Sequence, residues 1–247
     1  MALPTFGIII PARYGSTRFP GKPLSLIAGK PMIVRTVEAA LQCEPSIGVA
    51  VATDNQQIAE AVQHLVPVVF TREDHSTGTD RIAEAFTQLE WDCEVIVNLQ
   101  GDEPFIMPHQ VQDLVSYFQS PSTDIATLKK RISEDEDPND PNVVKVITDK
   151  SGRAMYFSRS LIPFNRGNTN YPYYRHIGMY AYRSKLLKRL SLLNNTILEE
   201  TEMLEQLRWL DFGYVIKVAE TQHEGPAVDT PEDLKIAEEY YSNSLGK

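Results

Sequence analysis

Short apolar runs alternate with amphipathic stretches through the first 100 residues, and this rhythm restricts the possible fold more than any other feature of the sequence. The apolar runs predict strands buried on both faces: Phe6–Ile10, Ile47–Ala52, Val66–Phe70 and Glu94–Leu99. The stretches between them predict helices over residues 31–41, 54–65 and 79–89. Strands joined by helices of this length form right-handed βαβ units with a parallel sheet. The first half therefore predicts an α/β domain.

The rhythm changes after about residue 120. Strands without helices between them are predicted over residues 125–129, 143–148, 154–158 and 176–182. A helix near 200–210, a strand near 214–219 and a helix from Pro231 close the chain. We expect one domain over residues 1–247, a three-layer α/β fold with a mixed central sheet and a small β-rich insertion near residues 121–190.

The charge of the 247-residue chain is unevenly distributed. The net charge is −9, yet the first 37 residues carry +5 with no acid, so the remainder carries −14. An acidic protein is a poor partner for nucleic acid or an anionic membrane surface, and we expect neither. One basic segment without acids is typical of a site for a small anion.

Other bulk features exclude further classes. Cys43 and Cys93 are too few for a disulfide scaffold or a zinc site. No basic residue precedes Arg13, so no secretory leader is expected, and no apolar stretch reaches the 18 residues of a membrane span. A reducing cytoplasm is the expected location.

The basic segment Pro11–Leu24 follows the first predicted strand and reads PARYGSTRFPGKPL. Its glycines allow backbone N–H groups to approach a ligand, and hydroxyls and cations complete what a polyphosphate needs. It is not a Walker A loop, because five residues separate Gly15 from Gly21 and Pro23 stands at the Ser/Thr position. A merely structural surface loop is the alternative.

Two acidic motifs follow later strands. Asn98–Pro104 (NLQGDEP) follows the fourth apolar run, and Val228–Asp233 (VDTPED) precedes the last helix. Ligands bind at the carboxyl ends of the strands in such sheets, where Asp102 and Asp229 would suit Mg²⁺ bridging to phosphate. Gly-Asp-Glu-Pro could instead form only a turn, and Thr230 could cap the helix beside a free Asp229.

Seven motifs, in order between about residues 6 and 240, together resemble the 3-deoxy-manno-octulosonate cytidylyltransferases, or CMP-KDO synthetases. They are PARYGSTRFPGKPL, HSTGTDR (75–81), NLQGDEP, YFSRSLIP (156–163), RHIGMYAY (175–182), EMLEQLR (202–208) and VDTPEDL. The resemblance implies a nucleotide-diphospho-sugar transferase-like, Rossmann-like fold, usually a homodimer, which activates KDO with CTP and Mg²⁺ for lipopolysaccharide biosynthesis. It also implies that nucleotide binding lies mainly in residues 1–120 and 220–247, and sugar binding and dimerisation mainly in 121–219.

The resemblance assigns roles to matching positions. CTP would be bound by Arg13, Ser16, Thr17, Lys22, Thr77, Gly78, Arg81 and Gln100. KDO would be bound by Gln100, Arg159, His176, Tyr180, Glu205 and Gln206. Asp102 and Asp229 would ligate Mg²⁺, and with Lys22 they form the expected catalytic set. The anomeric hydroxyl of KDO would attack the α-phosphate of CTP in one step, with loss of pyrophosphate.

Two alternatives stay open at this point. The chain could activate a different keto-acid sugar, such as amino-KDO or a sialic acid. It could also bind CTP without turnover, although a pure binding protein has no need for both Asp102 and Asp229 beside Lys22. A dehydrogenase is disfavoured, because no Gly-x-Gly-x-x-Gly follows the first strand.

Overall fold

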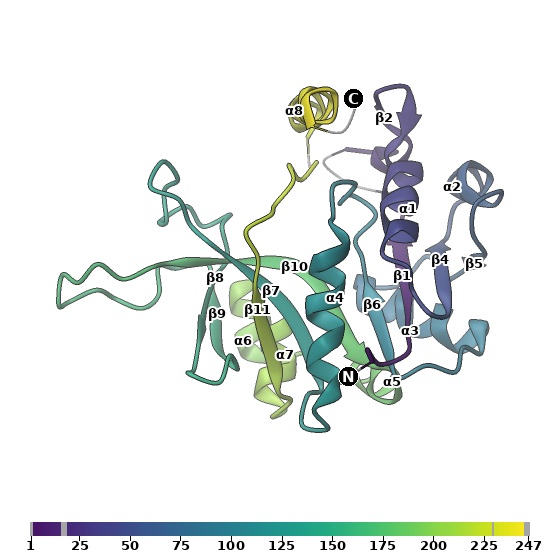
Figure 1. Cartoon of the computed structure of the whole chain (residues 1–247). Coiled ribbons are helices and arrows are strands. Elements are labelled where there is room, and N and C mark those ends of the chain that lie inside the picture. Colours follow the sequence, from purple (N-terminus) through teal and green to yellow (C-terminus); the bar gives the residue numbers. More distant parts are fainter. Residues whose placement is uncertain (1, 16–18, 229, 245–247) are drawn as a thin grey trace.

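The apolar runs of the first half form neighbouring parallel strands at the centre of one large sheet (Figure 1). The structure is a computed structural model that describes residues 2–15, 19–228 and 230–244. The central strands, in spatial order, are β5 (Val68–Phe70), β4 (Gly48–Thr53), β1 (Phe6–Ala12) and β6 (Val95–Asn98). Because all four are parallel, their carboxyl ends lie along one edge of the sheet.

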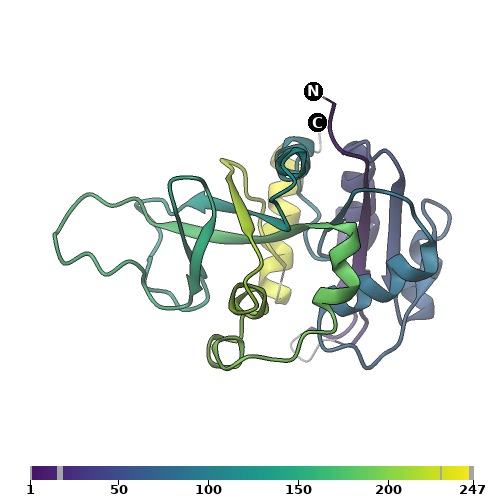
Figure 2. The ribbon, with the colours of Figure 1, turned by 90° about the horizontal axis from the view of Figure 1, so that it is seen from below.

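The second half continues the same sheet with mixed direction. Next to β6 lies antiparallel β10 (Tyr174–Arg183), followed by β7 (Ile125–Arg131) and, parallel to β7, β11 (Ile216–Glu220). Strands β8 (Lys145–Thr148) and β9 (Ala154–Ser158) pair with each other, and β8 also meets β10. The expected insertion near residues 121–190 is therefore narrower than predicted, because β7 and β10 belong to the main sheet and only the β8–β9 region extends from it (Figures 1 and 2).

Helices cover both faces of the sheet, and alternate strand residues supply the two cores. Ile8 and Ile10 face the layer of α1 (Met32–Gln42), α2 (Gln56–Val62) and α4 (Pro108–Ser116). Ile9 and Ile96 face α3 (Gly78–Leu89), α5 (Ser184–Leu190) and α7 (Gln206–Asp211). This alternation follows from the period of two along a strand. The predicted three-layer fold is confirmed.

Several predicted boundaries needed correction. Helices α4 and α5 were missed, although Pro108 at the helix start and the apolar faces of both were visible in the sequence. The helix expected near 200–210 is two short helices, α6 (Ile197–Glu202) and α7, because Met203 adopts a left-handed backbone with φ of 53°. Pro31 precedes α1 as its N-cap and pairs in the short β2–β3 ribbon (Leu26–Ile27 and Lys30–Pro31).

The last helix, α8 (Pro231–Ser244), begins with the predicted capping box. The Thr230 N–H donates to Asp233 Oδ2 at 2.8 Å, and the Asp233 N–H donates to Thr230 Oγ1 at 3.2 Å. Figure 1 shows α8 beyond the carboxyl edge of the sheet, in the same region as β2. Both cysteines are buried and free, and burial raises the pKa of the Cys93 thiol to about 11. Within the described part of the chain, no helix has the length and apolarity to cross a membrane.

A buried ion pair fixes α6 against α7. Arg208 Nε and Nη2 donate to the two carboxylate oxygens of Glu199 at 2.7 and 2.5 Å, and both residues are buried. Because Glu205 and Gln206 lie between these partners in sequence, the pair sets how α7 presents them.

Removal of one partner tests this arrangement. We expect Arg208→Met to lower the free energy of unfolding by about 3–5 kcal/mol, because Glu199 would remain buried without compensation. The double variant Glu199→Met/Arg208→Met should recover much of that loss. Arg153→Met, which breaks an exposed pair with Asp149, should be close to wild type. Urea unfolding followed by circular dichroism measures all three, and equal stability of the single and double Arg208 variants would contradict the account.

Candidate active site

A polar cavity of about 150 Å³ lies where β1, β6 and α3 meet. Residues expected to bind CTP line it: Arg13, Thr77, Gly78, Arg81 and Gln100. Thr77 caps α3 by accepting a hydrogen bond from the Asp80 N–H at 3.1 Å, so the positive end of the helix dipole faces this region. The structure thus brings together five residues from three separate motifs, and we call this space the nucleotide cavity.

Arg81 differs from the other four residues of the nucleotide cavity in having its charged group paired within the protein. Its guanidinium is buried and donates to Asp54 Oδ2 and Thr71 Oγ1, both at 2.5 Å. Its charge is therefore balanced within the protein, and the side chain forms a fixed wall of the nucleotide cavity.

The loop after β6 reaches across to the loop after β1. Lys22 Nζ lies 2.5 Å from Asp102 Oδ2, and both side chains are partly buried. A Cβ on Gly101 would lie 3.0 Å from the Pro11 carbonyl oxygen, so a residue without a side chain permits this close approach. The pair joins the lysine expected to neutralise pyrophosphate to the carboxylate expected to bind Mg²⁺.

A chain of hydrogen bonds runs from the nucleotide cavity to α7. Gln100 Nε2 donates to Asn98 Oδ1 at 2.9 Å, and Asn98 Nδ2 donates to the Tyr182 hydroxyl at 3.5 Å. The Tyr182 hydroxyl is 3.3 Å from Thr79 Oγ1, which donates to Glu205 Oε2 at 3.0 Å. These hydrogen bonds fix Gln100 and Glu205, which are expected to contact the substrates, relative to each other.

Most residues expected to bind the sugar surround a buried aromatic cluster. The Tyr180 ring meets His176 and Trp209 at centroid distances of 5.4 and 5.1 Å. The Tyr180 hydroxyl is buried and has no hydrogen-bond partner within the described chain, which suits a group that binds a ligand. Gln206 is buried nearby on α7.

His176 and Glu205 have shifted pKa values with the same cause. Burial lowers the pKa of His176 to about 3, so its ring is neutral at physiological pH and cannot supply a positive charge to a sugar carboxylate. Desolvation raises the pKa of Glu205 to about 7, opposed by hydrogen bonds from Thr79 and Thr77.

Arg159 lies apart from this cluster. Its Nε donates to the Glu202 carbonyl at 2.8 Å and its Nη1 to the Pro141 carbonyl at 3.0 Å. It lines neither the nucleotide cavity nor the second cavity described next, so its expected contact with the sugar remains a prediction.

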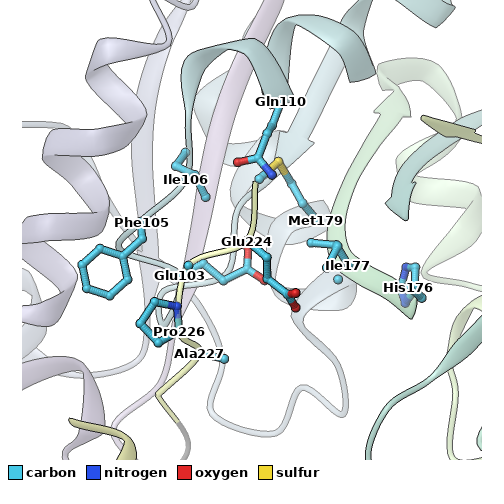
Figure 3. A pocket seen from close by; sticks show the side chains of 12 residues that line it. Glu103, Phe105, Ile106, Gln110, His176, Ile177, Met179, Glu224, Pro226 and Ala227 are labelled. Atoms are coloured by element: carbon cyan, nitrogen blue, oxygen red, sulfur yellow. The ribbon is translucent and has the colours of Figure 1, made fainter. Parts of the chain in front are cut away.

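A second cavity, of about 200 Å³, lies beside Asp102 at the same edge of the sheet. Figure 3 shows the Glu103 and Glu224 side chains between Phe105 and Pro226 on one side and Ile177 and His176 on the other. Burial raises the pKa of Glu103 to about 8, and the charges of Asp102 and Glu224 act in the same direction. We call this space the acidic cavity; of its lining residues, His176 alone is among the site residues predicted from the sequence.

Glu103 and Glu224 could have been recognised from their positions. Each lies just after the end of a strand at the carboxyl edge, Glu103 next to Asp102 and Glu224 after β11. The motif match predicts a metal-binding role for the neighbouring Asp102 and none for Glu103 or Glu224.

Three expected site residues, Ser16, Thr17 and Asp229, lie outside the described residues. Over residues 2–15, 19–228 and 230–244 no group of three or more His, Cys, Asp or Glu side chains is placed to hold a metal ion. One carboxylate is nevertheless sufficient for Mg²⁺ when phosphate oxygens and water complete the shell, and Asp102 fits that donor set.

The fold and this edge of the sheet define an α/β nucleotidyltransferase, with a polar nucleotide cavity and a lysine–carboxylate pair after β1 and β6. A solved 4-diphosphocytidyl-2C-methyl-D-erythritol synthase from Anaerococcus prevotii shares the fold alone, with a TM-score of 0.62 at 15% identity over 96% of this chain and 98% of its own. The chain belongs to the cytidylyltransferase family, whose model matches residues 7–218.

Relatives with similar sequences lie within this family. The chain is 47% identical over 246 residues to a 3-deoxy-manno-octulosonate cytidylyltransferase of Parabacteroides distasonis, covering 95% of this chain and 97% of the relative. It is 46% identical over 235 residues to an 8-amino-3,8-dideoxy-manno-octulosonate cytidylyltransferase of Shewanella halifaxensis, covering 94% and 96%. A solved CMP:2-keto-3-deoxy-manno-octonic acid synthetase complexed with CTP superposes with a TM-score of 0.92 at 41% identity, covering 97% and 99%. The family resemblance expected from the sequence is confirmed.

The raised pKa of Glu205 predicts a pH-dependent stability. Between the unfolded pKa of 4.5 and about 7 the folded protein binds the extra proton, so this group makes stability fall as the pH rises through that window. Glu205→Gln removes the free-energy cost of ionising this buried carboxyl group. The free energy of unfolding of the variant, relative to that of the wild type, should therefore rise by up to about 3 kcal/mol from pH 5 to pH 8. Urea unfolding at both pH values measures it, and a difference that does not change with pH would exclude Glu205 as the perturbed group.

Proposed function

We propose that the protein transfers CMP from CTP to the anomeric hydroxyl of 3-deoxy-manno-octulosonate, giving CMP-KDO and pyrophosphate. The observation that carries this proposal is the Lys22–Asp102 pair at 2.5 Å, which joins the segments after β1 and β6 that also supply Arg13 and Gln100 to the nucleotide cavity. The names of the relatives with about 47% identity support the choice of substrates. Synthesis of lipopolysaccharide is the process that such a product would serve.

The residues of the chain position CTP in this proposal. Arg13 and Gln100 bind the nucleotide in its cavity, where Gly78 at the start of α3 leaves room for it. Lys22 neutralises the triphosphate and the departing pyrophosphate, an electrostatic role suited to a transition state with charge on phosphate oxygens. Ser16 and Thr17, on the same loop, are the further phosphate contacts that the sequence predicts.

Asp102 would hold Mg²⁺, and Asp229 remains the predicted second ligand. When bound, the ion supplies positive charge to the α-phosphate and favours ionisation of the attacking hydroxyl. Lys22 must then exchange part of its contact with Asp102 for contact with phosphate. Glu205 and Tyr180, held by α7 and β10, would orient the sugar for in-line attack, so no covalent enzyme intermediate is required.

Asp102→Asn tests the catalytic assignment. The amide keeps the shape and can still accept a hydrogen bond from Lys22 but loses the charge, so we expect an intact fold and pyrophosphate release from CTP and KDO reduced at least about 100-fold. Titration of Mg²⁺ should show weaker dependence on the ion in the variant. Asp113→Asn, an exposed acid on α4, is the matched control. Near-normal turnover by Asp102→Asn would remove Asp102 from the metal site.

A homodimer is the proposed assembly, and exposed apolar side chains in the second half of the chain support it. Phe164 is 86% exposed, Ile197 at the start of α6 is 82% exposed, and Met203 just after α6 is 76% exposed. Large exposed apolar side chains such as these are candidates for burial at a protein–protein interface.

A negative charge in place of these exposed apolar side chains should weaken the dimer. We expect Phe164→Asp and Ile197→Asp together to shift the sedimentation coefficient from dimer to monomer. Phe70 is an exposed residue of β5, at the opposite edge of the sheet, and Phe70→Asp is the control that should not change the sedimentation coefficient. A wild-type protein that sediments as a monomer at micromolar concentration contradicts the proposed assembly.

A further inference from the structure

Among the side chains that line the acidic cavity, Glu103 is the one that has a buried polar atom without a hydrogen-bond partner in the described chain. Its Oε2 atom is buried and has no hydrogen-bond partner there. A buried acceptor without a donor costs free energy in the folded state, and such groups are rare unless a ligand or water completes them. The geometry therefore calls for a hydrogen-bonding group of a ligand inside this cavity.

The other polar side chains of the cavity are already engaged. Glu224 pairs with Lys130 at 3.3 Å and with Arg175 at 3.4 Å. Gln110 Nε2 donates to the His223 carbonyl at 3.1 Å, and His176 Nε2 is 2.9 Å from Thr127 Oγ1. These contacts leave Glu103 to meet a ligand.

The rest of the lining restricts what that ligand can be. Phe105, Ile106, Met179 and Pro226 are apolar, and neither arginine nor lysine belongs to the lining. A Cβ on Gly225 would lie 2.3 Å from the Cβ of Phe105, so the cavity wall is closely packed there. The lining offers no cation to a carboxylate, whereas a hydroxyl or an ammonium group on a short carbon chain fits beside the Glu103 carboxyl group.

The position of the cavity relates it to the sugar. Glu103 follows Asp102 directly, and His176 of the expected sugar set forms the opposite wall (Figure 3). KDO carries its carboxylate and reacting hydroxyl at one end of an eight-carbon chain and a hydroxyl at the other. The two similar relatives, at 47% and 46% identity, are named for substrates that differ at carbon 8, where one has an amino group.

We propose that the acidic cavity receives the carbon-8 end of the octulosonate and that Glu103 accepts a hydrogen bond from the donor there, hydroxyl or ammonium. Glu103 is then a residue that determines sugar specificity, and the sugar lies with its carboxylate directed away from this cavity. This inference rests on the proposed function, because it concerns the second substrate of the same reaction.

The test compares three sugars that differ only at carbon 8: KDO, its 8-amino analogue and 3,8-dideoxy-manno-octulosonate, which has no donor there. Pyrophosphate release is measured at saturating CTP and Mg²⁺. For the wild-type protein we expect kcat/KM for the sugar without a donor to fall about 10- to 100-fold below that for KDO, because Glu103 would be left without a partner. This comparison needs no variant and holds even if a variant fails to fold.

Two variants then locate the effect. Glu103→Ala should abolish the preference for KDO over the 8-deoxy sugar, by raising KM for KDO while KM for CTP stays unchanged. Glu103→Gln keeps an acceptor oxygen but cannot ionise beside an ammonium group, so it should affect the 8-amino sugar about 10-fold more than KDO if ammonium is the natural donor, and both sugars alike if hydroxyl is. Asp113→Asn, an exposed acid on α4 that does not line the acidic cavity, is the control that should keep the preference.

The failures of the two proposals differ. A wild-type protein that uses KDO and the 8-deoxy sugar equally well, or a Glu103→Ala variant that keeps the preference, would overturn the role of Glu103; in that case water alone completes the Oε2 atom. A merely structural Glu103 would lower kcat for all three sugars by the same factor. Failure of the proposed function itself would appear as no pyrophosphate from CTP and KDO with the wild-type protein.

Discussion

The site depends on the pairing of β6 with β1 on one side and with β10 on the other. The parallel register of Ile9 with Asn98 brings the ends of β1 and β6 together, and the antiparallel register of Tyr180 with Asn98 brings β10 to the same point. The loop that follows β6 therefore emerges between the nucleotide cavity and the acidic cavity. Asp102 lies in that loop beside Lys22, where one carboxylate is within reach of groups from both halves of the chain.

Charge is distributed around this point in a way that serves two different substrates. The loop after β1 carries cations and no acids, and the start of α3 adds the positive end of a helix dipole, which suits a triphosphate. Beyond Asp102 the lining becomes acidic or neutral, with Glu103, Glu224 and an uncharged His176. A polyanion is favoured on one side of β6 and a polyhydroxylated chain on the other. Each of the two substrates therefore has its own side of the site. The hydrogen-bonded chain from Gln100 to Glu205 keeps the two sides in fixed register.

The sequence was sufficient to predict the parts of the fold that rest on local patterns. Apolar runs predicted β1, β4 and β6, the amphipathic stretches predicted α1, α2 and α3, and Thr230 with Asp233 predicted the start of α8. The break at Met203 was not predictable, because a left-handed backbone at a methionine depends on tertiary contacts of α6 and α7. In the same way, motif matching named Gln100 and Glu205, but the bonds through Asn98, Tyr182 and Thr79 depend on which strands become neighbours. The position of Glu103 after β6 is visible in the sequence, but its unpartnered buried oxygen becomes visible only when its surroundings are known.

The central claim is that the two sides of β6 deliver a sugar hydroxyl to the α-phosphate of CTP. The most direct measurement uses KDO labelled with ¹⁸O at its anomeric hydroxyl, with CTP and Mg²⁺, and observes the products by ³¹P NMR. The account predicts that the label appears in the bridging oxygen of a CMP-sugar phosphodiester and that the pyrophosphate carries none. A product whose bridging oxygen is unlabelled, or pyrophosphate released without a phosphodiester product, would contradict it.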